Sequence, residues 1–369
     1  GKLVQEKLGL GELELLLVDE NLEEIVVNSV HEPVWVYHKK FGWLKTNILL
    51  QSEEQILNYS AIIGRKVGKQ INNLAPLMDA NLLSGDRVNA TLFPISTKGN
   101  SITIRKFAKD PWTMASLVDS NTVNLEVGAL CWLATQYELN VLVGGGTASG
   151  KTSLLNAILA FTPPNQRIIS LEDTRELVLH DFLHWTPMAT RQSNPEGKGG
   201  VELLDLMVNA LRMRPDRIVL GEIRRQREAE VLFEAMHTGH AVYSTVHADD
   251  VVQVKNRLTN PPISLPESVL GALHLVIIQY RQRRTGIRRT YQVAEVSAHG
   301  DKVNFNVAYS WDARQDKLAP VSKLSRILEY LSLHTGWTEK EVLDDLKEKQ
   351  NILGSMVKHK VFKIEQVGR

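Results

Sequence analysis

The sequence predicts an α/β protein with a smaller α+β domain on its N-terminal side and a helical tail. Three observations predict this. At 369 residues the chain is longer than one ordinary hydrophobic core. From about residue 122, short apolar runs alternate with helical patterns, which is typical of a largely parallel, covered sheet. Within that region a glycine loop separates an apolar run from a helical pattern. The expected domains are 1–108 and 122–321, with a linker at 109–121 and a helical subdomain at 322–369.

The region before residue 108 has the pattern of a compact α+β domain. Four short alternating runs predict strands: Glu24–Asn28, Val34–Tyr37, Val88–Phe93 and Ser101–Phe107. Ser52 and Gln55 form a capping box ahead of a helical stretch that carries Ile56 and Ile63 on one side. The segment at 107–121 holds a proline, several small polar residues and little periodicity, so a linker is expected there. No catalytic motif lies in this first domain.

The second domain is marked by buried strands that alternate with amphipathic helices. The expected strands are Leu139–Val143, Arg167–Leu171, Arg217–Leu220 and Ala241–Val246. One helix is expected over Val201–Met213 and another over Gln226–Thr238, which Gly239 would end. The residues expected on the buried face of the first helix are Leu204, Met207, Val208 and Leu211.

A basic run, Arg281–Arg289, follows these elements and has two interpretations. It could contact nucleic acid or an acidic partner, or it could be a hairpin of solvated strands that turns at Thr285 and Gly286. The hairpin is favoured, because the interleaved aromatic residues typical of single-strand binding are missing. The tail is expected to be helical. Its first stripe is Leu324, Ile327, Leu328 and Leu331, and Thr338 with Glu341 forms a capping box for a second helix.

The most informative stretch is the glycine loop in VLVGGGTASGKTSLLN at 141–156. Gly145, Gly150, Lys151 and Thr152 form a Gly-x-x-x-x-Gly-Lys-Thr signature in a strand–loop–helix context. Backbone N–H groups at the start of a helix bind anions, and glycines permit the angles that such a loop needs. We therefore expect ATP and Mg²⁺ here, with Lys151 at the terminal phosphates and the Thr152 hydroxyl on the metal. The residues expected to contact the nucleotide are Gly145, Gly146, Thr147, Ala148, Ser149, Gly150, Lys151, Thr152, Ser153 and His240.

Polar groups follow three of the predicted strands. Glu172, Glu222 and His247 each come just after an apolar run, and ligands of open α/β sheets bind at the carboxyl ends of strands. ATP hydrolysis needs a metal, a carboxylate that orients or deprotonates water, and a group that responds to the γ-phosphate. Glu172 and Glu222 are the expected carboxylate pair, with Glu222 also near the metal, and His247 is the expected sensor. His240 lies at the other end of the third strand.

Composition limits the remaining classes of function. Hydrophobic residues make up 43% and charged residues 23% of the chain, as in ordinary globular proteins, and a net charge of +1 gives no polycation for nucleic acid. No apolar run reaches the length of a membrane span, and the first residues lack the apolar segment of a secretory signal. The single Cys131 excludes internal disulfides and an all-cysteine zinc site within one chain. These features favour a cytoplasmic protein.

With these motifs in order, the chain resembles the type II/type IV secretion ATPases, the hexameric motors of pili, archaella and secretion machines. The matching segments are a Walker A motif at Gly145–Thr152, an acidic box at Arg167–Glu176 (RIISLEDTRE), a Walker B segment at Arg214–Arg224 (RPDRIVLGEIR) and a histidine box at Thr238–His247 (TGHAVYSTVH). In the Walker B segment, Gly221 and Glu222 stand where Asp-Glu is usual. NPEGK at 194–198, LRMRPD at 211–216 and VYHKKFGWLKTN at 36–47 look closest to the Flp/Tad and archaeal branches. The four-cysteine zinc module of some members is missing.

The resemblance implies a RecA-like core and roles for individual residues. It implies that Glu172 is the general base or water-orienting carboxylate and that Glu222 lies at or near Mg²⁺, although which glutamate does which stays open. It also implies that arginines of the first domain reach the nucleotide, and Arg87 and Arg105 match those positions. The residues alone favour two surface arginines. Further candidates with less support are Arg191, Arg212 and Arg214.

Two classes of function stay open. The first is a homo-hexameric ATPase at the cytoplasmic face of a membrane platform protein, peripherally associated with the cell membrane. It would convert ATP hydrolysis into mechanical work on a pilus-like filament, an archaellum or a secretion machine. The second is a P-loop motor that translocates nucleic acid, of the conjugation or packaging type. The order of the motifs, the near-neutral net charge and the missing aromatic–basic patch favour the first, with no nucleic-acid partner.

Overall fold

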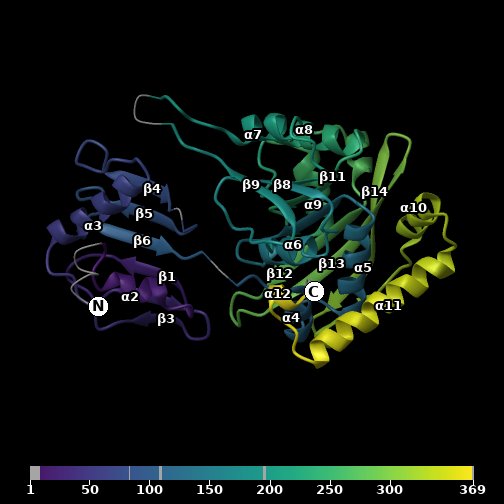
Figure 1. Ribbon diagram of the computed structural model, residues 1–369, viewed down its shortest axis with the longest axis horizontal. Coiled ribbons are helices and arrows are strands. Elements are labelled where there is room, and N and C mark those ends of the chain that lie inside the picture. The colour runs from purple at the N-terminus through teal and green to yellow at the C-terminus, as the bar shows by residue number, and fades with distance from the viewer. Residues whose placement is uncertain (1–8, 83, 108–109, 194–196, 368–369) are drawn as a thin grey trace. The chain divides into compact units, whose positions relative to one another are not determined.

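The computed structural model describes residues 9–82, 84–107, 110–193 and 197–367 (Figure 1). The chain divides into two compact units, Gly1–Lys109 and Asp110–Arg369. The first unit contains a six-stranded sheet and the second a nine-stranded sheet, each with helices packed on it. The predicted α/β class is therefore confirmed.

The first unit packs two helices on one face of an antiparallel sheet with the strand order β3-β2-β1-β6-β5-β4. Its strands are β1 (Leu22–Val27), β2 (Trp35–His38), β3 (Gly42–Lys45), β4 (Leu77–Asn81), β5 (Arg87–Thr91) and β6 (Ser101–Arg105), and its helices are α2 (Leu13–Val18) and α3 (Glu53–Lys66). Buried and exposed residues alternate along β5 and β6, because the helices cover only one face. Ser52 caps α3 as predicted, since its hydroxyl accepts the backbone N–H of Gln55 at 3.2 Å. Ile56 and Ile63 lie in the core.

The segment expected to be a linker contains a helix of the second unit. Helix α4 (Met114–Asp119) begins after Thr113, which forms a capping box with Ser116. Met114 and Leu117 are buried in the core of that unit. The expectation of a linker over 109–121 is therefore wrong for most of its length, because the small polar residues that suggested a linker are helix caps. Residue 109 itself lies outside the described residues.

The second unit is built on a mixed sheet with the order β15-β14-β13-β12-β7-β11-β10-β8-β9. The strands from β12 to β9 in this order are parallel neighbours: β7 (Val141–Gly145), β8 (Arg167–Glu172), β9 (His184–Ala189), β10 (Arg217–Leu220), β11 (Ala241–Val246) and β12 (Leu275–Arg281). An antiparallel extension follows, formed by β13 (Arg288–His299), β14 (Lys302–Asp312) and β15 (Lys317–Pro320). The predicted hairpin is confirmed, because Arg281 of β12 pairs with Arg288 of β13.

Helices cover both faces of this sheet, as its hydrophobic strands require. In β7, Val141 and Val143 pack into one cluster while Leu142 packs into the other. The first face carries α4, α5 (Leu125–Gln136), α6 (Lys151–Leu159), α10 (Ser325–Thr335) and α11 (Glu339–Lys358). The second face carries α7 (Leu203–Ala210), α8 (Gln226–His237), α9 (Val251–Thr259) and the 3₁₀ helix η1 (Glu267–Ala272), and α12 (Ile364–Val367) ends the described chain. The result is a layered α/β core.

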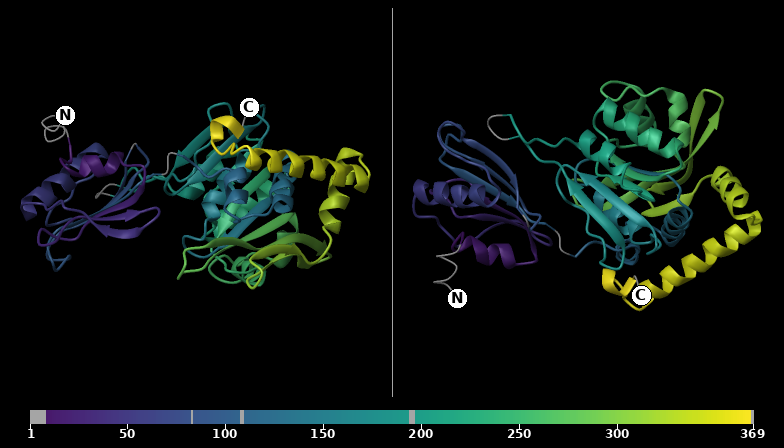
Figure 2. Two further views of the ribbon diagram at one scale, coloured as in Figure 1. Left: turned by 90° about the horizontal axis from the view of Figure 1, so that it is seen from below. Right: turned by 45° about the horizontal axis from the view of Figure 1, so that its top comes forward.

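The helical tail packs against this core. Ile327 and Leu331 of α10 are buried, and Thr338 forms the predicted capping box with Glu341 at the start of α11. Figure 2 shows α10 and α11 in yellow along the side of the second unit. Among the helices that the structure describes, none has the length and apolar character needed to cross a bilayer.

The buried face of α7 differs from the prediction. Leu203, Met207 and Ala210 are buried, whereas Val208 is 41% exposed. The helix is shorter than expected, and Leu203, its first residue, sets a face with the spacing i, i+4, i+7. The predicted buried face, which included Val208, is therefore offset by one residue from the observed one.

Candidate functional site

The glycine loop joins β7 to α6 and has the backbone of an anion cradle. Gly145, Ala148 and Gly150 have positive φ angles of 151°, 58° and 97°. A Cβ atom on Gly145 would lie 2.5 Å from the carbonyl oxygen of Gln279, so only glycine fits there. Among the described residues, the backbone N–H groups of Gly150 and Lys151 donate to no carbonyl. Donors left unused at a helix start are those that bind phosphate.

Lys151 lies over this loop and among acidic side chains. Its Nζ donates to the carbonyl oxygens of Gly145 and Gly146 at 2.8 and 2.9 Å. Burial lowers the pKa of Lys151, and the nearby carboxylates of Glu222, Glu176 and Asp249 act against that shift. Asp249 is a site residue that sequence reasoning missed, since it lies two positions beyond the histidine box.

Glu176 is a second residue whose position the sequence did not reveal. Its Oε2 accepts a hydrogen bond from the Thr152 hydroxyl at 2.9 Å. The acidic box includes Glu176, but no spacing rule points it at the loop. The hydroxyl expected on the metal is therefore oriented by a carboxylate from the segment after β8.

Glu172 is the last residue of β8 and is only 3% exposed. Its Oε1 accepts the backbone N–H groups of Glu176 and Leu177 at 2.9 and 3.1 Å, while Oε2 has no hydrogen-bond partner among the described residues. Burial raises the pKa of Glu172 to about 7, in spite of these two backbone hydrogen bonds. A carboxylate held by one oxygen, with a pKa near neutrality, is suited to accept a proton.

Gly221 lies beside this buried side chain. A Cβ atom on Gly221 would be in ordinary van der Waals contact with Cγ of Glu172, at 3.4 Å. The next residue, Glu222, has a partly exposed side chain whose Oε2 lies 2.8 Å from Arg224 Nη2. Arg224 also forms an ion pair with Asp173 at 2.7 Å. One arginine thus links the acidic box to the Walker B segment.

The two histidines of the histidine box lie at opposite edges of the sheet. β7 and β11 are parallel, with Val246 opposite Gly144, so His247 emerges beside the loop. Its Nε2 lies 3.1 Å from the Thr147 hydroxyl. His240 precedes β11, which has six residues and is therefore about 20 Å long. Within one chain the whole strand separates His240 from the loop, so His240 does not reach a nucleotide bound at the loop of its own chain.

Arg87 and Arg105 lie in the first unit on neighbouring strands. They are direct cross-strand partners, and both side chains are exposed. Asp79 accepts hydrogen bonds from Nε and Nη2 of Arg87 at 3.0 and 2.8 Å. Arg105 lies directly opposite Glu24 of β1, so each arginine of the pair has an acidic neighbour within this unit.

The other candidate arginines are scattered. Arg191 follows β9 and its Nε donates to the carbonyl of Gly199 at 2.6 Å. Arg212 and Arg214 precede β10, at the edge of the sheet opposite the glycine loop, so they cannot contact the loop of their own chain. The first three residues of the NPEGK stretch, 194–196, lie outside the described residues.

The acidic groups near the loop fit a metal that arrives with a nucleotide. In the part of the chain that the structure describes, no group of three or more His, Cys, Asp or Glu could hold a metal ion alone. Mg²⁺ needs only one or two protein ligands when phosphate oxygens and waters complete its shell. The Thr152 hydroxyl, which Glu176 orients, and the carboxylate of Glu222 near Lys151 suit that partial role.

Comparison with known proteins identifies relatives of this chain. Residues 81–295 match the family described as type II/IV secretion system protein. An uncharacterized protein of Methanocaldococcus jannaschii is 34% identical over 377 residues, an alignment that covers 99% of this chain and 67% of the relative. A putative conjugal transfer protein of Mycobacterium tuberculosis is 30% identical over 299 residues, covering 78% of this chain and 84% of that protein.

A solved structure has a similar fold. The pilus retraction motor PilT with bound ADP matches with a TM-score of 0.58 and 18% identity, over 92% of this chain and 96% of that one. At this identity the likeness concerns the fold alone. The family match over more than half of the chain and the 34% identical relative show that the chain belongs to the type II/IV secretion system protein family.

Proposed function

We propose that the chain hydrolyses ATP and, as a ring of six copies, drives a pilus-like filament, an archaellum or a secretion machine from the cytoplasmic face of a membrane platform. The proposal of ATP hydrolysis rests on one observation. A glycine loop with unused N–H donors and a buried, half-partnered glutamate lie at the carboxyl ends of β7 and β8, two parallel strands of one sheet. This combination supplies both a phosphate site and a proton acceptor.

The loop residues bind and orient the nucleotide in this proposal. Lys151 exchanges its bonds to the Gly145 and Gly146 carbonyls for the terminal phosphates, which leaves its charge compensated throughout. Thr152 and Glu222 hold Mg²⁺, whose chemistry is to neutralise charge on the phosphate oxygens. His247, beside Thr147 at the start of the loop, is positioned to respond to the γ-phosphate.

Glu172 and Glu222 divide the carboxylate roles according to their surroundings. Glu172 is buried, and its pKa of about 7 lets it accept a proton from water at neutral pH. Glu222 is partly exposed and paired with a cation, so it stays available as a metal ligand. We therefore propose Glu172 as the general base and Glu222 as the ligand of the metal.

The ring hypothesis rests on the first unit. It presents Arg87 opposite Arg105 on the sheet face that α2 and α3 leave uncovered. Guanidinium groups stabilise charge that develops on a transferred phosphoryl group. We propose that this arginine pair completes an ATP site at each interface of the ring, so that domain closure is coupled to hydrolysis.

Replacing both arginines by alanine should leave ATP binding to the second unit intact and lower turnover by at least about a hundredfold, as removal of an arginine finger does. The measurement is ATPase rate against protein concentration, with oligomeric state followed by light scattering. Wild-type specific activity should rise with concentration until the ring is complete. Replacing Arg65 and Lys66 of α3, on the opposite side of the sheet, removes the same charge and should change little. An Arg87→Ala, Arg105→Ala double variant that turns over like wild type, together with a monomeric wild type, would contradict the ring mechanism.

Translocation of nucleic acid is the second candidate, and the name of the Mycobacterium tuberculosis relative favours it. The basic segment that could serve it is a β-hairpin whose turn carries Arg283 and Arg284. We expect no stimulation of the ATPase rate by DNA at low salt. Stimulation by DNA that is lost steeply as salt increases would instead support the nucleic-acid motor.

A further inference from the structure

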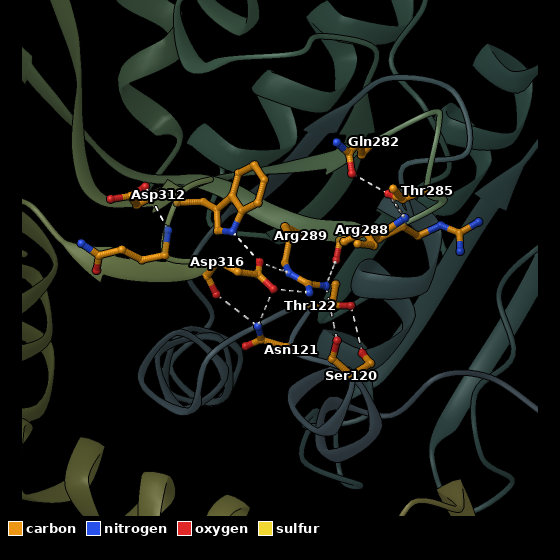
Figure 3. A network of polar contacts seen from close by, with 12 residues as sticks. Ser120, Asn121, Thr122, Gln282, Thr285, Arg288, Arg289, Asp312 and Asp316 are labelled. Atoms are coloured by element: carbon orange, nitrogen blue, oxygen red, sulfur yellow. Dashed lines mark hydrogen bonds and ion pairs between the residues drawn. The ribbon is translucent and has the colours of Figure 1, made fainter.

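We propose that Arg288 is a positioning residue for the glycine loop, and that the ion pair between Arg289 and Asp316 fixes it there. This role rests on the proposed function, since it concerns how the loop is prepared for ATP. The basic hairpin would then serve the nucleotide site of its own chain. Figure 3 shows the network of polar contacts that surrounds these residues.

Arg288 reaches the loop from the first position of β13, far away in sequence. Its Nε donates to the carbonyl oxygen of Ala148 at 3.0 Å. A Cβ atom built on Gly150 would lie 3.5 Å from Cδ of Arg288, so the arginine stem runs along the outer side of the loop. Ala148 has a φ of 58°, which is unfavourable for a residue with a side chain. The hydrogen bond therefore stabilises Ala148, a residue of the loop whose backbone conformation is unfavourable by itself.

The neighbouring Arg289 holds the backbone at this point. Its Nε and Nη2 donate to the two carboxylate oxygens of Asp316, each at 2.7 Å, which is a bidentate pair. Its Nη1 donates to the carbonyl oxygen of Arg288 at 2.8 Å. The Arg289 side chain is 12% exposed and that of Asp316 is 47% exposed, so water reaches the pair from the carboxylate side. The side chain that forms the ion pair thus also binds the main chain of Arg288.

Asp316 is itself held from other segments. Its carboxylate also accepts hydrogen bonds from Trp311 Nε1 at 3.0 Å and from Asn121 Nδ2 at 3.3 Å. Thr290, which follows Arg289 in β13, donates its backbone N–H to the carbonyl oxygen of Thr122 at 2.7 Å. The start of β13 is therefore fixed between the β14–β15 turn and the segment after α4. A fixed strand start can hold the loop that it contacts.

A simpler explanation is that Arg288 only adds positive charge near a phosphate site. The hairpin offers a matched comparison, because Arg284 is exposed in its turn and makes no hydrogen bond or ion pair with another described residue. General attraction depends on charge alone, so salt would screen it, and removing the negative charge of Asp316 would strengthen ATP binding instead of weakening it. Loss of the hydrogen bond to Ala148 would affect Arg288 alone.

A positioning role also predicts which kinetic constant changes. A preorganised loop binds the phosphates equally well in the ground state and in the transition state. Loss of the hydrogen bond that preorganises it should therefore raise KM and Kd for ATP and leave kcat nearly unchanged. Replacing Arg288 by methionine keeps most of the stem and removes the donor. One hydrogen bond of this kind corresponds to about a three- to tenfold loss in affinity.

The experiment measures Kd for Mg²⁺-ATP, kcat and KM on the full chain. Arg288→Met should raise Kd and KM by about three- to tenfold, Arg288→Lys should restore part of the loss, and Arg284→Met should resemble wild type. Asp316→Asn should reproduce the effect of Arg288→Met, and the double variant should be no worse than either single one, because both remove the same contact. Equal effects of Arg288→Met and Arg284→Met, or full additivity with Asp316→Asn, would overturn the proposal. A wild-type protein that does not hydrolyse ATP would instead overturn the proposed function.

Discussion

Replacement of Lys151 by alanine should abolish ATP hydrolysis and leave the fold intact. Lys151 carries the cation of the loop, and three carboxylates surround it: Glu222, Glu176 and Asp249. Without its ammonium, these carboxylates would repel the incoming phosphates instead of being compensated. Positioning and electrostatic stabilisation supply most of the catalysis in phosphoryl transfer, so losses of at least about a thousandfold are expected from this one change.

The fold should survive, because the Lys151 side chain packs in no core cluster. Its bonds go to two carbonyls of the same loop, which water can hydrate in the variant. The measurements are steady-state phosphate release and thermal unfolding of the purified chain. Lys323, an exposed lysine of the same unit, provides the control substitution and should change neither measurement. Substantial turnover by Lys151→Ala would show that the loop is not the hydrolytic site.

Motifs made of neighbouring residues were predictable. The strand–loop–helix context places the glycine loop, and the carboxyl ends of parallel strands share one edge, which brings Glu172, Glu222 and His247 to the loop side of the sheet. The same rule, applied strictly, would have excluded His240, which precedes its strand. Caps were also predictable, as at Ser52 and Thr338, because a cap is encoded within four residues.

Features that depend on distant residues were not predictable. β9 has no fully buried residue, since it lies at the edge of the sheet, so it carries no run of apolar residues that would mark it as a strand. The polar caps of α4 resembled a linker, because Thr and Ser serve both purposes. The contact of Arg288 with Ala148 joins residues that no local pattern relates. The hydrogen bond from Thr152 to Glu176 depends on how the segment after β8 folds back on the loop.

Replacement of Glu172 by glutamine should slow hydrolysis by about a hundredfold or more while ATP still binds, because a general base typically contributes that much. Glutamine keeps the shape of the side chain and its acceptor oxygen, which two backbone N–H groups bind. It loses the charge that takes a proton from water. The measurements are kcat and Kd for ATP. Glu222→Gln should also slow hydrolysis, and its effect should lessen at high Mg²⁺ if Glu222 serves the metal.

The pH dependence of stability provides a test of Glu172 that does not rely on activity. Burial raises its folded-state pKa from an ordinary value of 4.5 to about 7. The folded chain therefore holds this proton more tightly than the unfolded chain does. The stability linked to the proton is fully present below pH 4.5 and is lost as the pH rises through about 7. The loss amounts to about 3 kcal/mol of unfolding free energy at pH 8.

Glutamine has no carboxyl group to ionise, so the Glu172→Gln variant stays uncharged at this position as the pH rises. Its free energy of unfolding, relative to wild type, should therefore increase by about 3 kcal/mol between pH 4.5 and pH 8, whatever the offset at acid pH. Denaturant titrations of both proteins at several pH values measure this difference, and contributions from other titrating groups cancel in it. Glu222→Gln, which replaces a partly exposed carboxylate paired with Arg224, is measured alongside for comparison. A Glu172→Gln variant that follows the wild-type pH profile of stability would show that burial does not raise the pKa of Glu172, and it would remove the reason for choosing Glu172 over Glu222 as the general base.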